Sequence, residues 1–487
     1  MRTVQLVVVG GGVAGTAAAR AAAQLGVAVL LVDEQPLGAS AYRRNVPYWF
    51  GPRAARRPER APDLYGWLAG HPMLGQAIED GVDLRLACSV WGVFPDGQRS
   101  IVGLFDGQRT ELVRAQAVIV ATGATDLHLA FPGWTLGGVL GGLGAASLLE
   151  TSGYLEAQRL LVLGTGRLAL DVARRAAAAG TEVVGLVDAD ADAGTDADAD
   201  VGAAGLQVWP QHTIRRAYGG ADVEAVTLAR IERRLEQASE NVIIGTENVL
   251  TTSENVLLQV DAVCVAIGQQ PAIELAALAQ CELAYGLPQG GWCVAHAADG
   301  TTSRPGIFVA GDAGGVQDAG AAISSGERAG QAAAIWLATG AHTWRPGPRA
   351  VAPNVFASRW HALAEGMAPT NSNDGDEDAT IICRCEEITR GEVRRTLQAE
   401  GATDPNEIKR ISRAGMGVCQ GRGCRPLIAG LVAQHTGRRY AEVPLSSFRP
   451  PVRSISLRAL ATEEGADGPL LEPFGAANFS LPRRPAE

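Results

Sequence analysis

Close to its N-terminus the chain has an apolar run, a glycine-rich turn and a helix of small residues in immediate succession, and this order allows few folds. Residues 4–9 are largely apolar and predict a buried strand, and residues 17–25 predict a helix. Residues 27–32 predict a second buried strand, which ends at Asp33 and Glu34. Strand, glycine turn, helix, strand and acid are the parts of a dinucleotide-binding unit.

The turn of this unit contains Gly10, Gly12 and Gly15, and each glycine has its own role. Gly10 makes the turn, Gly12 lets backbone amides approach a pyrophosphate, and Gly15 lets the helix pack closely on the strand. Asp33 or Glu34 can accept hydrogen bonds from a ribose. The unit therefore predicts a nucleotide site, and the alternative is a structural remnant of one.

A second unit of the same kind begins near residue 160. A strand over 160–163 is followed by Gly164 and Gly166, a helix, a strand over 183–187 and then Asp188. An alanine takes the third glycine position, which the pattern tolerates. Asp188 and the alternating Asp and Ala residues after it favour a ribose without a 2′-phosphate. We interpret that acidic tract as a solvated loop and not as a metal site. The alternatives for this unit are NAD, ATP or no nucleotide.

The strand predicted at 260–266 returns from the second unit to the first, so one nucleotide domain is nested inside the other. The predicted fold class is α/β, with two nested Rossmann-like dinucleotide-binding domains and a small helical domain at the C-terminus. We expect a first nucleotide-binding domain over 1–145 and 290–342, a second, NAD-like domain over 146–289, a connector over 343–380, a cysteine domain over 381–436 and an extended tail over 437–487. Within the connector, one helix is expected over 355–365.

Four of the eight cysteines lie in two close pairs near the C-terminus. One residue separates Cys383 from Cys385, and four residues separate Cys419 from Cys424. Four thiolates in two pairs suit a 2Fe–2S cluster, because the protein must complete the coordination of each iron. Zinc is one alternative, but it usually has two to four residues within each pair. Structural cysteines without a metal are the other alternative.

The stretches around the cysteine pairs predict short loops next to helix starts. Thr389 and Glu392 have the spacing of a capping box, and Asp404 before a proline marks a second helix start. Gly415 and Gly417 let the loop before the second pair bend tightly. The basic residues placed to offset the negative charge of a cluster are Arg384, Arg413, Arg422 and Arg425.

This segment resembles the small 2Fe–2S domain of bacterioferritin-associated ferredoxin over about residues 381–436. The resemblance rests on both cysteine pairs, on Gly-Met-Gly at 415–417 and on Cys-Gln-Gly-Arg-Gly-Cys at 419–424. It implies that the four paired cysteines ligate one 2Fe–2S cluster.

Two further segments resemble the glutathione-reductase-like flavoproteins, which have two dinucleotide-binding domains. They are the strand and turn at 118–123 and the stretch 302–312, which ends in Gly311 and Asp312. The resemblance implies FAD in the first domain, with Asp312 holding the ribityl chain. The alternative role of Asp312 is to cap the helix expected at 319–337.

The residues expected to contact nucleotide come from both domains. In the first domain they are Gly10, Gly12, Val13, Ala14, Gly15, Asp33, Glu34, Gln35, Val90, Thr122, Gly123, Gly311 and Asp312, and in the second domain they are Gly164, Gly166, Arg167 and Asp188.

Over nearly its whole length the chain resembles the alpha subunits of octopine and nopaline oxidases and of D-hydroxyproline and proline dehydrogenases, and the middle subunit of hydrogen cyanide synthase. The supporting stretches are Asp-Glu-Gln-Pro at 33–36, Phe-Pro-Gly-Trp-Thr at 131–135 and Arg-Pro-Pro-Val at 449–452. One departure lies at 37–43, where Leu-Gly-Ala-Ser-Ala-Tyr-Arg replaces the usual Gly-Gly-Gln and so changes the flavin environment.

This resemblance implies a division of labour between subunits. A smaller FAD-bearing subunit oxidises a C–N bond of an amino-acid-like substrate, and the alpha subunit passes the electrons on. Some members of the family also have an FMN at the interface between subunits, or a third small subunit.

The leading prediction is an electron-transferring flavo-iron–sulfur subunit of a heteromeric dehydrogenase or oxidase acting on an amino acid or opine, with a quinone or similar acceptor. The alternatives are a self-contained NADH-dependent reductase with FAD and the cluster, and a non-catalytic scaffold. The sequence has no Cys-x-x-Cys, which argues against a disulfide relay, and its net charge of −10 argues against a nucleic-acid partner. No catalytic residue is assigned. We expect a cytoplasmic protein without a transmembrane segment, and peripheral association with the inner membrane stays open.

Overall fold

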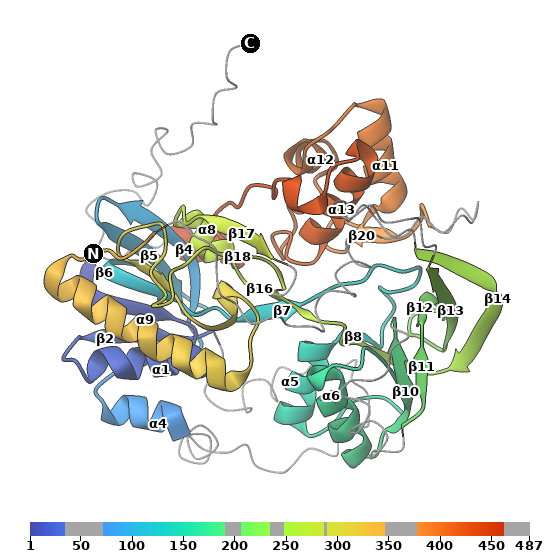
Figure 1. Cartoon of the computed structure of the whole chain (residues 1–487), viewed down its shortest axis with the longest axis horizontal. Helices are drawn as coiled ribbons and strands as arrows, with labels where there is room; N and C mark the ends of the chain where they lie inside the picture. Colours follow the sequence, from blue (N-terminus) through green and yellow to red (C-terminus); the bar gives the residue numbers. More distant parts are fainter. Residues whose placement is uncertain (35–71, 190–205, 234–247, 287–289, 346–376, 462–487) are drawn as a thin grey trace.

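The computed structural model describes residues 1–34, 72–189, 206–233, 248–286, 290–345 and 377–461. Its elements form three groups (Figure 1): a large sheet with helices, a second sheet with two helices beside an antiparallel sheet, and a cluster of helices near the C-terminus. The stretches over 37–43 and 355–365, the acidic tract after Asp188 and Gln35 lie outside the described residues.

The first group is built on a seven-stranded sheet in the order β3-β2-β1-β6-β5-β4, with β19 paired to β6. Its strands are β1 (Arg2–Val9), β2 (Val29–Val32), β3 (Asp83–Arg85), β4 (Ser89–Asp96), β5 (Arg99–Phe105), β6 (Thr110–Val120) and β19 (Ile307–Val309). Strands β1, β2, β3, β6 and β19 run parallel to one another, whereas β5 runs antiparallel to β4 and β6. Since β19 follows the second group in sequence, two separate segments of the chain build this sheet.

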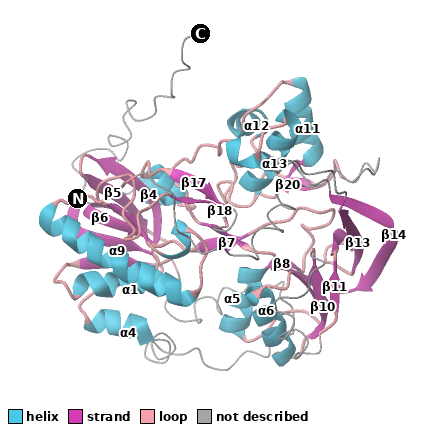
Figure 2. Cartoon of the chain, in the orientation of Figure 1, coloured by secondary structure: helices cyan, strands magenta, loops and turns pink. Residues whose placement is uncertain are grey.

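Both faces of this sheet are buried, so alternate residues of its strands enter two different cores. Leu6 and Val8 pack with helices α1 (Val13–Ala23) and α9 (Ala319–Thr339), while Val7 and Val9 pack on the opposite face. Figure 2 shows α1 and α9 side by side, with α4 (Pro72–Glu79) next to α1.

Glycines in α9 set how closely the two helices approach. A Cβ on Gly326 would lie 2.1 Å from the carbonyl oxygen of Ala14, and one on Gly330 would lie 2.2 Å from that of Ala18. Only glycine therefore fits at these two positions, because the obstacle is backbone and not a side chain that can move.

The second group contains a five-stranded parallel sheet in the order β11-β10-β9-β15-β8. Its elements are β8 (Val139–Gly141), α5 (Gly142–Ser152), β9 (Arg159–Leu163), α6 (Arg167–Ala178), β10 (Glu182–Asp188), β11 (Val208–Pro210) and β15 (Ala262–Val265). An antiparallel sheet follows β11 and consists of β12 (His212–Tyr218), β13 (Ala225–Arg233) and β14 (Asn248–Gln259). Strand β8 joins the parallel sheet although it precedes residue 146, and we propose that the second domain starts near residue 139.

Two short antiparallel strands connect the two groups. They are β7 (Ala124–Asp126) and β16 (Gln269–Pro271). After β16 come α8 (Glu274–Leu278) and the antiparallel pair β17 (Leu283–Gly286) and β18 (Gly291–Val294). The chain therefore leaves the first group at β7 and returns to it at β16, as the nested arrangement predicts.

The C-terminal group is small and mainly helical. It contains β20 (Ile381–Cys383), β21 (Ile388–Thr389), α11 (Arg390–Ala399), α12 (Pro405–Ser412), α13 (Cys424–Thr436) and η5 (Tyr440–Glu442). The capping box of Thr389 and Glu392 and the cap formed by Asp404 are both present, so both predicted helix starts are confirmed.

The chain then returns to the first group through a segment over residues 443–461, here called the strap. The backbone N–H of Val452 donates to the carbonyl of Trp91 at 2.9 Å, and the Val452 side chain is buried. Arg453 pairs with Glu34 at 2.6 Å, and the Thr110 hydroxyl donates to the carbonyl of Ala459 at 2.8 Å within α14 (Leu457–Ala461). The strap therefore joins the cysteine domain to the first sheet.

Candidate functional sites: two nucleotide loops and a cysteine cluster

In the first glycine loop, the backbone leaves no room for a side chain at Gly10 or Gly15. Gly10 has φ +110°, and its N–H donates to the carbonyl of Val32 at 2.8 Å. A Cβ on Gly10 would lie 2.2 Å from the carbonyl oxygen of Ala121, and one on Gly15 would lie 1.9 Å from that of Gly10. The loop therefore keeps its shape only with glycine at both positions.

Gly12 differs from these two, because nothing lies within 4 Å of the Cβ it would carry. It is the N-cap of α1 and provides no side-chain cap for the first-turn N–H groups. An open space in front of unpaired amides at a helix N-terminus suits a pyrophosphate. The residues present thus fit the dinucleotide that the sequence predicts.

The two acids after β2 have different partners. The Asp33 carboxylate accepts the N–H of Gly11 at 2.5 Å, so it lies against the glycine loop. The exposed Glu34 carboxylate pairs with Arg453 of the strap. Asp33 is therefore the acid that the loop positions, and Glu34 reaches the same region from the strap side.

Several other residues expected in the first domain lie near this loop. The Thr122 hydroxyl donates to the carbonyl of Ala272 at 2.6 Å, next to Gly123 at φ +71°. Ala14 is buried beneath Gly311, whose Cβ would lie 2.7 Å from that of Ala14, while Val13 is 44% exposed. The small side chain of Ala14 therefore lets the start of α1 pack against the stretch that carries Gly311.

Val90 lies on β4, with its side chain in the core of the first sheet. The register of β4 against β5 shifts between Val90 and Gly92. A contact between Val90 and a nucleotide would therefore have to come from its backbone.

Asp312 is largely buried, and its carboxylate accepts the N–H of Gln317 at 3.1 Å. Burial raises the pKa of this carboxyl, although the Gln317 amide opposes the rise. The alternative role, capping of the following helix, is wrong, because Asp318 is the N-cap of α9 and accepts the N–H of Ala321. Asp312 therefore has a role other than capping that helix.

The second glycine loop repeats the geometry of the first. Gly164 has φ +114°, and its Cβ would lie 2.4 Å from the carbonyl oxygen of Ala266. Gly166 is the N-cap of α6 and faces open space, as Gly12 does. The Asp188 carboxylate accepts the Thr165 hydroxyl at 2.5 Å, and Arg167 is exposed on the first turn of α6. This loop can also accept a dinucleotide.

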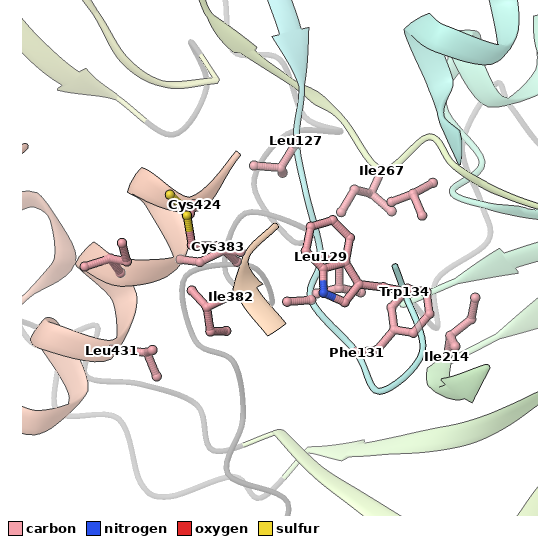
Figure 3. Packing of buried hydrophobic residues seen from close by; sticks show 14 of the residues in the cluster. Leu127, Leu129, Phe131, Trp134, Ile214, Ile267, Ile382, Cys383, Cys424 and Leu431 are labelled. Carbon is pink, nitrogen blue, oxygen red and sulfur yellow. The ribbon is translucent and has the colours of Figure 1, made fainter. Parts of the chain in front are cut away.

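The four predicted cluster cysteines form two thiol–thiol contacts, each between one cysteine of the first sequence pair and one of the second. Cys383 is hydrogen-bonded to Cys424, and Cys385 to Cys419. Cys383 and Cys424 are buried, whereas Cys419 is half-buried and Cys385 is exposed. Figure 3 shows the sulfurs of Cys383 and Cys424 close together. The other four cysteines, Cys88, Cys264, Cys281 and Cys293, are buried elsewhere in the chain.

The two buried thiols, Cys383 and Cys424, differ in pKa. The hydrogen bond from Cys424 lowers the pKa of Cys383 to about 6, and the N–H of Gly415 contributes from 3.4 Å. The same contact and burial raise the pKa of Cys424 well above its usual value. Backbone amides that favour a thiolate in this way also suit sulfur bound to iron.

The loop that precedes Cys419 packs against the loop of the first cysteine pair. A Cβ on Gly417 would lie 2.2 Å from the Cβ of Cys385, and Gly415 has φ +82°. Glycine at 417 thus lets the two cysteine loops approach each other, and glycine at 415 permits the bend.

Two pairs of thiols favour an iron–sulfur cluster over a single metal ion. A 2Fe–2S cluster needs two protein ligands at each of its two irons, which matches the arrangement of the cysteines.

Arginines surround this site at different depths. Arg425 is buried over the ring of Phe448, donates to the carbonyl of Gln420 at 2.8 Å, and is the cation best placed to balance a buried cluster. Arg422 is half-buried and donates to the carbonyl of Cys419 at 3.1 Å. Arg413 pairs with Glu386 at the surface, and Arg384 is exposed.

Two hydrogen bonds hold the cysteine domain against β16 and against the segment that follows β7. The indole N–H of Trp134 donates to the carbonyl of Ile381 at 2.7 Å, and Gln270 donates to the carbonyl of Arg422 at 2.9 Å. Figure 3 shows Leu127, Leu129, Phe131 and Trp134 facing the segment that carries Ile382 and Cys383. The cysteine domain and the second nucleotide domain therefore share one hydrophobic core.

Sequence reasoning missed three contributors to these sites: Gln270, Arg453 and Lys409. Gln270 and Arg453 link the cysteine domain or the strap to the first domain, and Lys409 is a buried cation whose Nζ donates to the carbonyl of Ser447 at 2.8 Å. The only available signal was the Pro-Pro-Val stretch before Arg453, which suggested an extended tail.

None of the helices in the described ranges is both long and apolar enough to cross a bilayer.

Comparison with known proteins covers both parts of the chain. Residues 4–326 match the pyridine nucleotide-disulphide oxidoreductase model, and residues 381–434 match the BFD-like [2Fe-2S] binding domain. An opine oxidase subunit of Agrobacterium tumefaciens is 30% identical, with 94% of this chain and 91% of the relative covered. The HcnB subunit of hydrogen cyanide synthase from Pseudomonas protegens is 30% identical, with 92% and 98% covered.

Among solved structures, L-proline dehydrogenase from P. horikoshii superposes with a TM-score of 0.65 at 21% identity. The superposition covers 94% of this chain and 80% of the other, and it supports the fold alone. The predicted α/β fold class with a small helical C-terminal domain is confirmed.

Proposed function

Because this chain belongs to the pyridine nucleotide-disulphide oxidoreductase family, and within it to the relatives of the opine oxidase and hydrogen cyanide synthase subunits, we propose that it is the electron-transferring flavo-iron–sulfur subunit of a heteromeric amino-acid or opine dehydrogenase. It is a subunit of an FAD-dependent oxidoreductase, and its cofactors are FAD and a 2Fe–2S cluster. When bound, FAD would allow this chain to take up electrons in pairs, and the cluster would allow it to pass them on singly.

One observation carries this proposal. The four cysteines form two pairs, and the hydrophobic core that holds them continues into the segment after β7, between the two nucleotide domains. The shared core and the Trp134 and Gln270 hydrogen bonds hold the cysteine domain against the nucleotide domains, which would keep a bound cluster at a fixed position. A flexibly tethered cluster domain would not need these contacts.

We propose the following division of roles. Gly10, Gly12, Gly15, Asp33 and Asp312 hold FAD, and the four paired cysteines hold the cluster, while Arg425 balances its charge. The chain's own residues bind and orient the cofactors. We assign none of them to proton transfer from the substrate.

The relatives are named as subunits, so a partner chain is part of the proposal. We propose that the partner is a smaller FAD-bearing subunit that takes a hydride from the carbon bearing nitrogen. An FMN at the interface, an external electron acceptor and a third small subunit complete the proposed pathway. The proposed location is the cytoplasm, including the cytoplasmic surface of the inner membrane.

The test compares the purified single chain with the co-expressed complex. Octopine, nopaline, proline, hydroxyproline and glycine are supplied with an artificial dye as acceptor. We expect the single chain to turn over at least ~100-fold more slowly than the complex, because the substrate-oxidising flavin belongs to the partner. Equal rates would refute the proposal that the chain works only with its partner.

A second measurement separates the reductase alternative. NADH is added to the anaerobic single chain while flavin absorbance is followed. Bleaching of the flavin would favour a self-contained reductase, and we expect none. A chain that carries no flavin or iron even within the complex would favour the scaffold alternative.

For the second nucleotide loop we propose an adenine nucleotide without a 2′-phosphate. The Asp188 carboxylate, held by Thr165, would accept ribose hydroxyls but repel a phosphate. We expect calorimetry to give at least about tenfold tighter binding of NAD or ATP than of NADP. Tighter binding of NADP would contradict the charge argument. An Asp188→Asn variant should lose most of the discrimination, which ties the preference to this carboxylate.

A further inference from the structure

We propose that the outer edge of the cysteine domain, around Met416 and Val418, is a docking surface for a separate electron-accepting protein with an acidic surface. This inference rests on the proposed function, because it requires electrons to leave through the cluster. It adds the chemical class of the acceptor and the surface that receives it.

The first observation is that the four cysteines differ in their exposure to solvent. Cys383 and Cys424 are buried, whereas Cys385 is exposed and Cys419 is half-buried. Val418 precedes Cys419 directly, and its side chain is 72% exposed. A protein that approaches the cluster from solvent would therefore meet this loop.

The loop holds its apolar side chains outward in a fixed shape. The N–H of Gln420 donates to the carbonyl of Gly417 at 2.8 Å, and the Gln420 side chain donates to the same carbonyl at 3.1 Å. The N–H of Met416 donates to the carbonyl of Arg413 at 2.9 Å. Met416 and Val418 are thus exposed by a hydrogen-bonded turn, which lowers the entropy cost of docking.

A basic pocket adjoins these apolar side chains. It has a volume of about 260 Å³, and Met416 is part of its wall together with Lys409, Arg410 and Arg449. No aspartate or glutamate of the described residues lines it. The size suits one or two carboxylate side chains of a partner.

The cations of this pocket lie close enough to influence one another. Burial and the nearby Arg425 and Arg449 lower the pKa of Lys409. The Lys409 ammonium donates to the carbonyl of Ser447 at 2.8 Å. A carboxylate entering the pocket would therefore relieve repulsion as well as form ion pairs. The whole chain carries a net charge of −10, so this basic surface is a local exception.

The composition of the surface argues for a transient partner. A permanent interface between subunits usually buries roughly 2,000 Å² or more and has a large apolar core. Here two exposed apolar side chains are bordered by cations, which is typical of weak electron-transfer encounters. The acceptor should therefore bind and leave on each cycle, with its encounter rate raised by charge.

The test uses the complete complex, reduced with dithionite and mixed in a stopped-flow instrument with one of three acceptors. These are cytochrome b5, an acidic haem protein, cytochrome c, a basic haem protein, and a short-chain ubiquinone. In the haem reactions, one electron passes from the reduced cluster to ferric haem, which becomes ferrous, and no proton is required.

We expect cytochrome b5 to react at least about fivefold more slowly at about 300 mM salt than at about 20 mM, because salt screens the attraction. Arg410→Glu should slow the low-salt reaction at least about tenfold. The matched control is Arg395→Glu, an exposed residue of α11 in the same domain that does not line the pocket, and it should change the rate less than about twofold. Val418→Asp tests the apolar part, with Ile335→Asp on α9 as its control.

Equal effects of Arg410→Glu and Arg395→Glu would overturn the proposal, as would faster reduction of cytochrome c than of cytochrome b5 at low salt. Fast reduction of ubiquinone that neither variant alters, with cytochrome b5 left oxidised, would also overturn it. Substrate-to-dye activity is measured on the same samples. Loss of that activity in wild type points to failure of the proposed function, whereas intact activity with an unresponsive cytochrome b5 rate rejects only the docking surface.

Discussion

Replacing Gly12 with valine will leave the protein folded but reduce its flavin content to less than about one-tenth of wild type. Gly12 has φ −68°, which valine tolerates, and nothing lies within 4 Å of the added Cβ. The side chain would therefore fill only the space in which the pyrophosphate binds. Flavin released by heat denaturation and a thermal melt of the same sample measure the two parts of this expectation.

Gly166→Val is the matched control, because Gly166 has φ −69° and the same open surroundings at the head of α6. It should keep full flavin content while weakening nucleotide binding in the second domain. Gly15→Val is the contrasting variant, since its Cβ would lie 1.9 Å from a backbone oxygen and the domain should misfold. Loss of flavin in Gly166→Val with full flavin in Gly12→Val would show that the two loops have been assigned the wrong way round.

Replacing Cys419 with serine will remove most of the iron, from about two atoms per chain to below about half an atom. Cys419 is half-buried, so the substitution itself disturbs little packing, unlike changes at the buried Cys383 or Cys424. Because ligand binding and folding are coupled, we expect the melting temperature to fall by at least about 5 °C. Iron and sulfide analysis of anaerobically prepared protein, with visible absorption spectra, measures the loss.

Cys88→Ala serves as the control, because Cys88 lies in the core of the first sheet, remote in sequence from the paired cysteines. It should keep its iron, although a small cavity will lower its stability. Wild-type protein that contains zinc and no iron would reject the cluster. Full iron in Cys419→Ser would remove that residue from the ligand set.

The parts of the fold that could be predicted from the sequence are those enforced within a few residues of each other. Gly10 and Gly164 need positive φ, and each would collide with a neighbouring backbone oxygen if it carried a side chain, so glycine spacing alone marked both nucleotide loops. Thr389 and Asp404 cap their helices through side-chain bonds two or three residues away, and both starts were predicted correctly.

Contacts between distant segments could not be predicted in this way. Glu34 and Arg453 are 419 residues apart, and neither belongs to a repeating pattern that would indicate the other. Gly326 and Gly330 lie against the backbone of α1, which is more than 300 residues away in sequence, so no local pattern indicates this contact. For Asp312, the sequence left a cap and a ribityl contact open, because an acid before a helix suits both; the position of Asp318 rules out the cap, and the ribityl contact stays a prediction.

The strap has a consequence for the order in which this protein can be made. Val452 fills a buried place in the core of the first sheet, beside Trp91, yet it is synthesised after both nucleotide domains and the cysteine domain. Ribosomes add about 5–20 residues per second, so Val452 follows β19, the last strand of this sheet to be synthesised, by roughly 7–30 seconds. During that interval the place of the Val452 side chain in this core is unfilled. The first domain to be translated is therefore among the last to be finished, and a chain that ended before residue 452 would lack one side chain of its core.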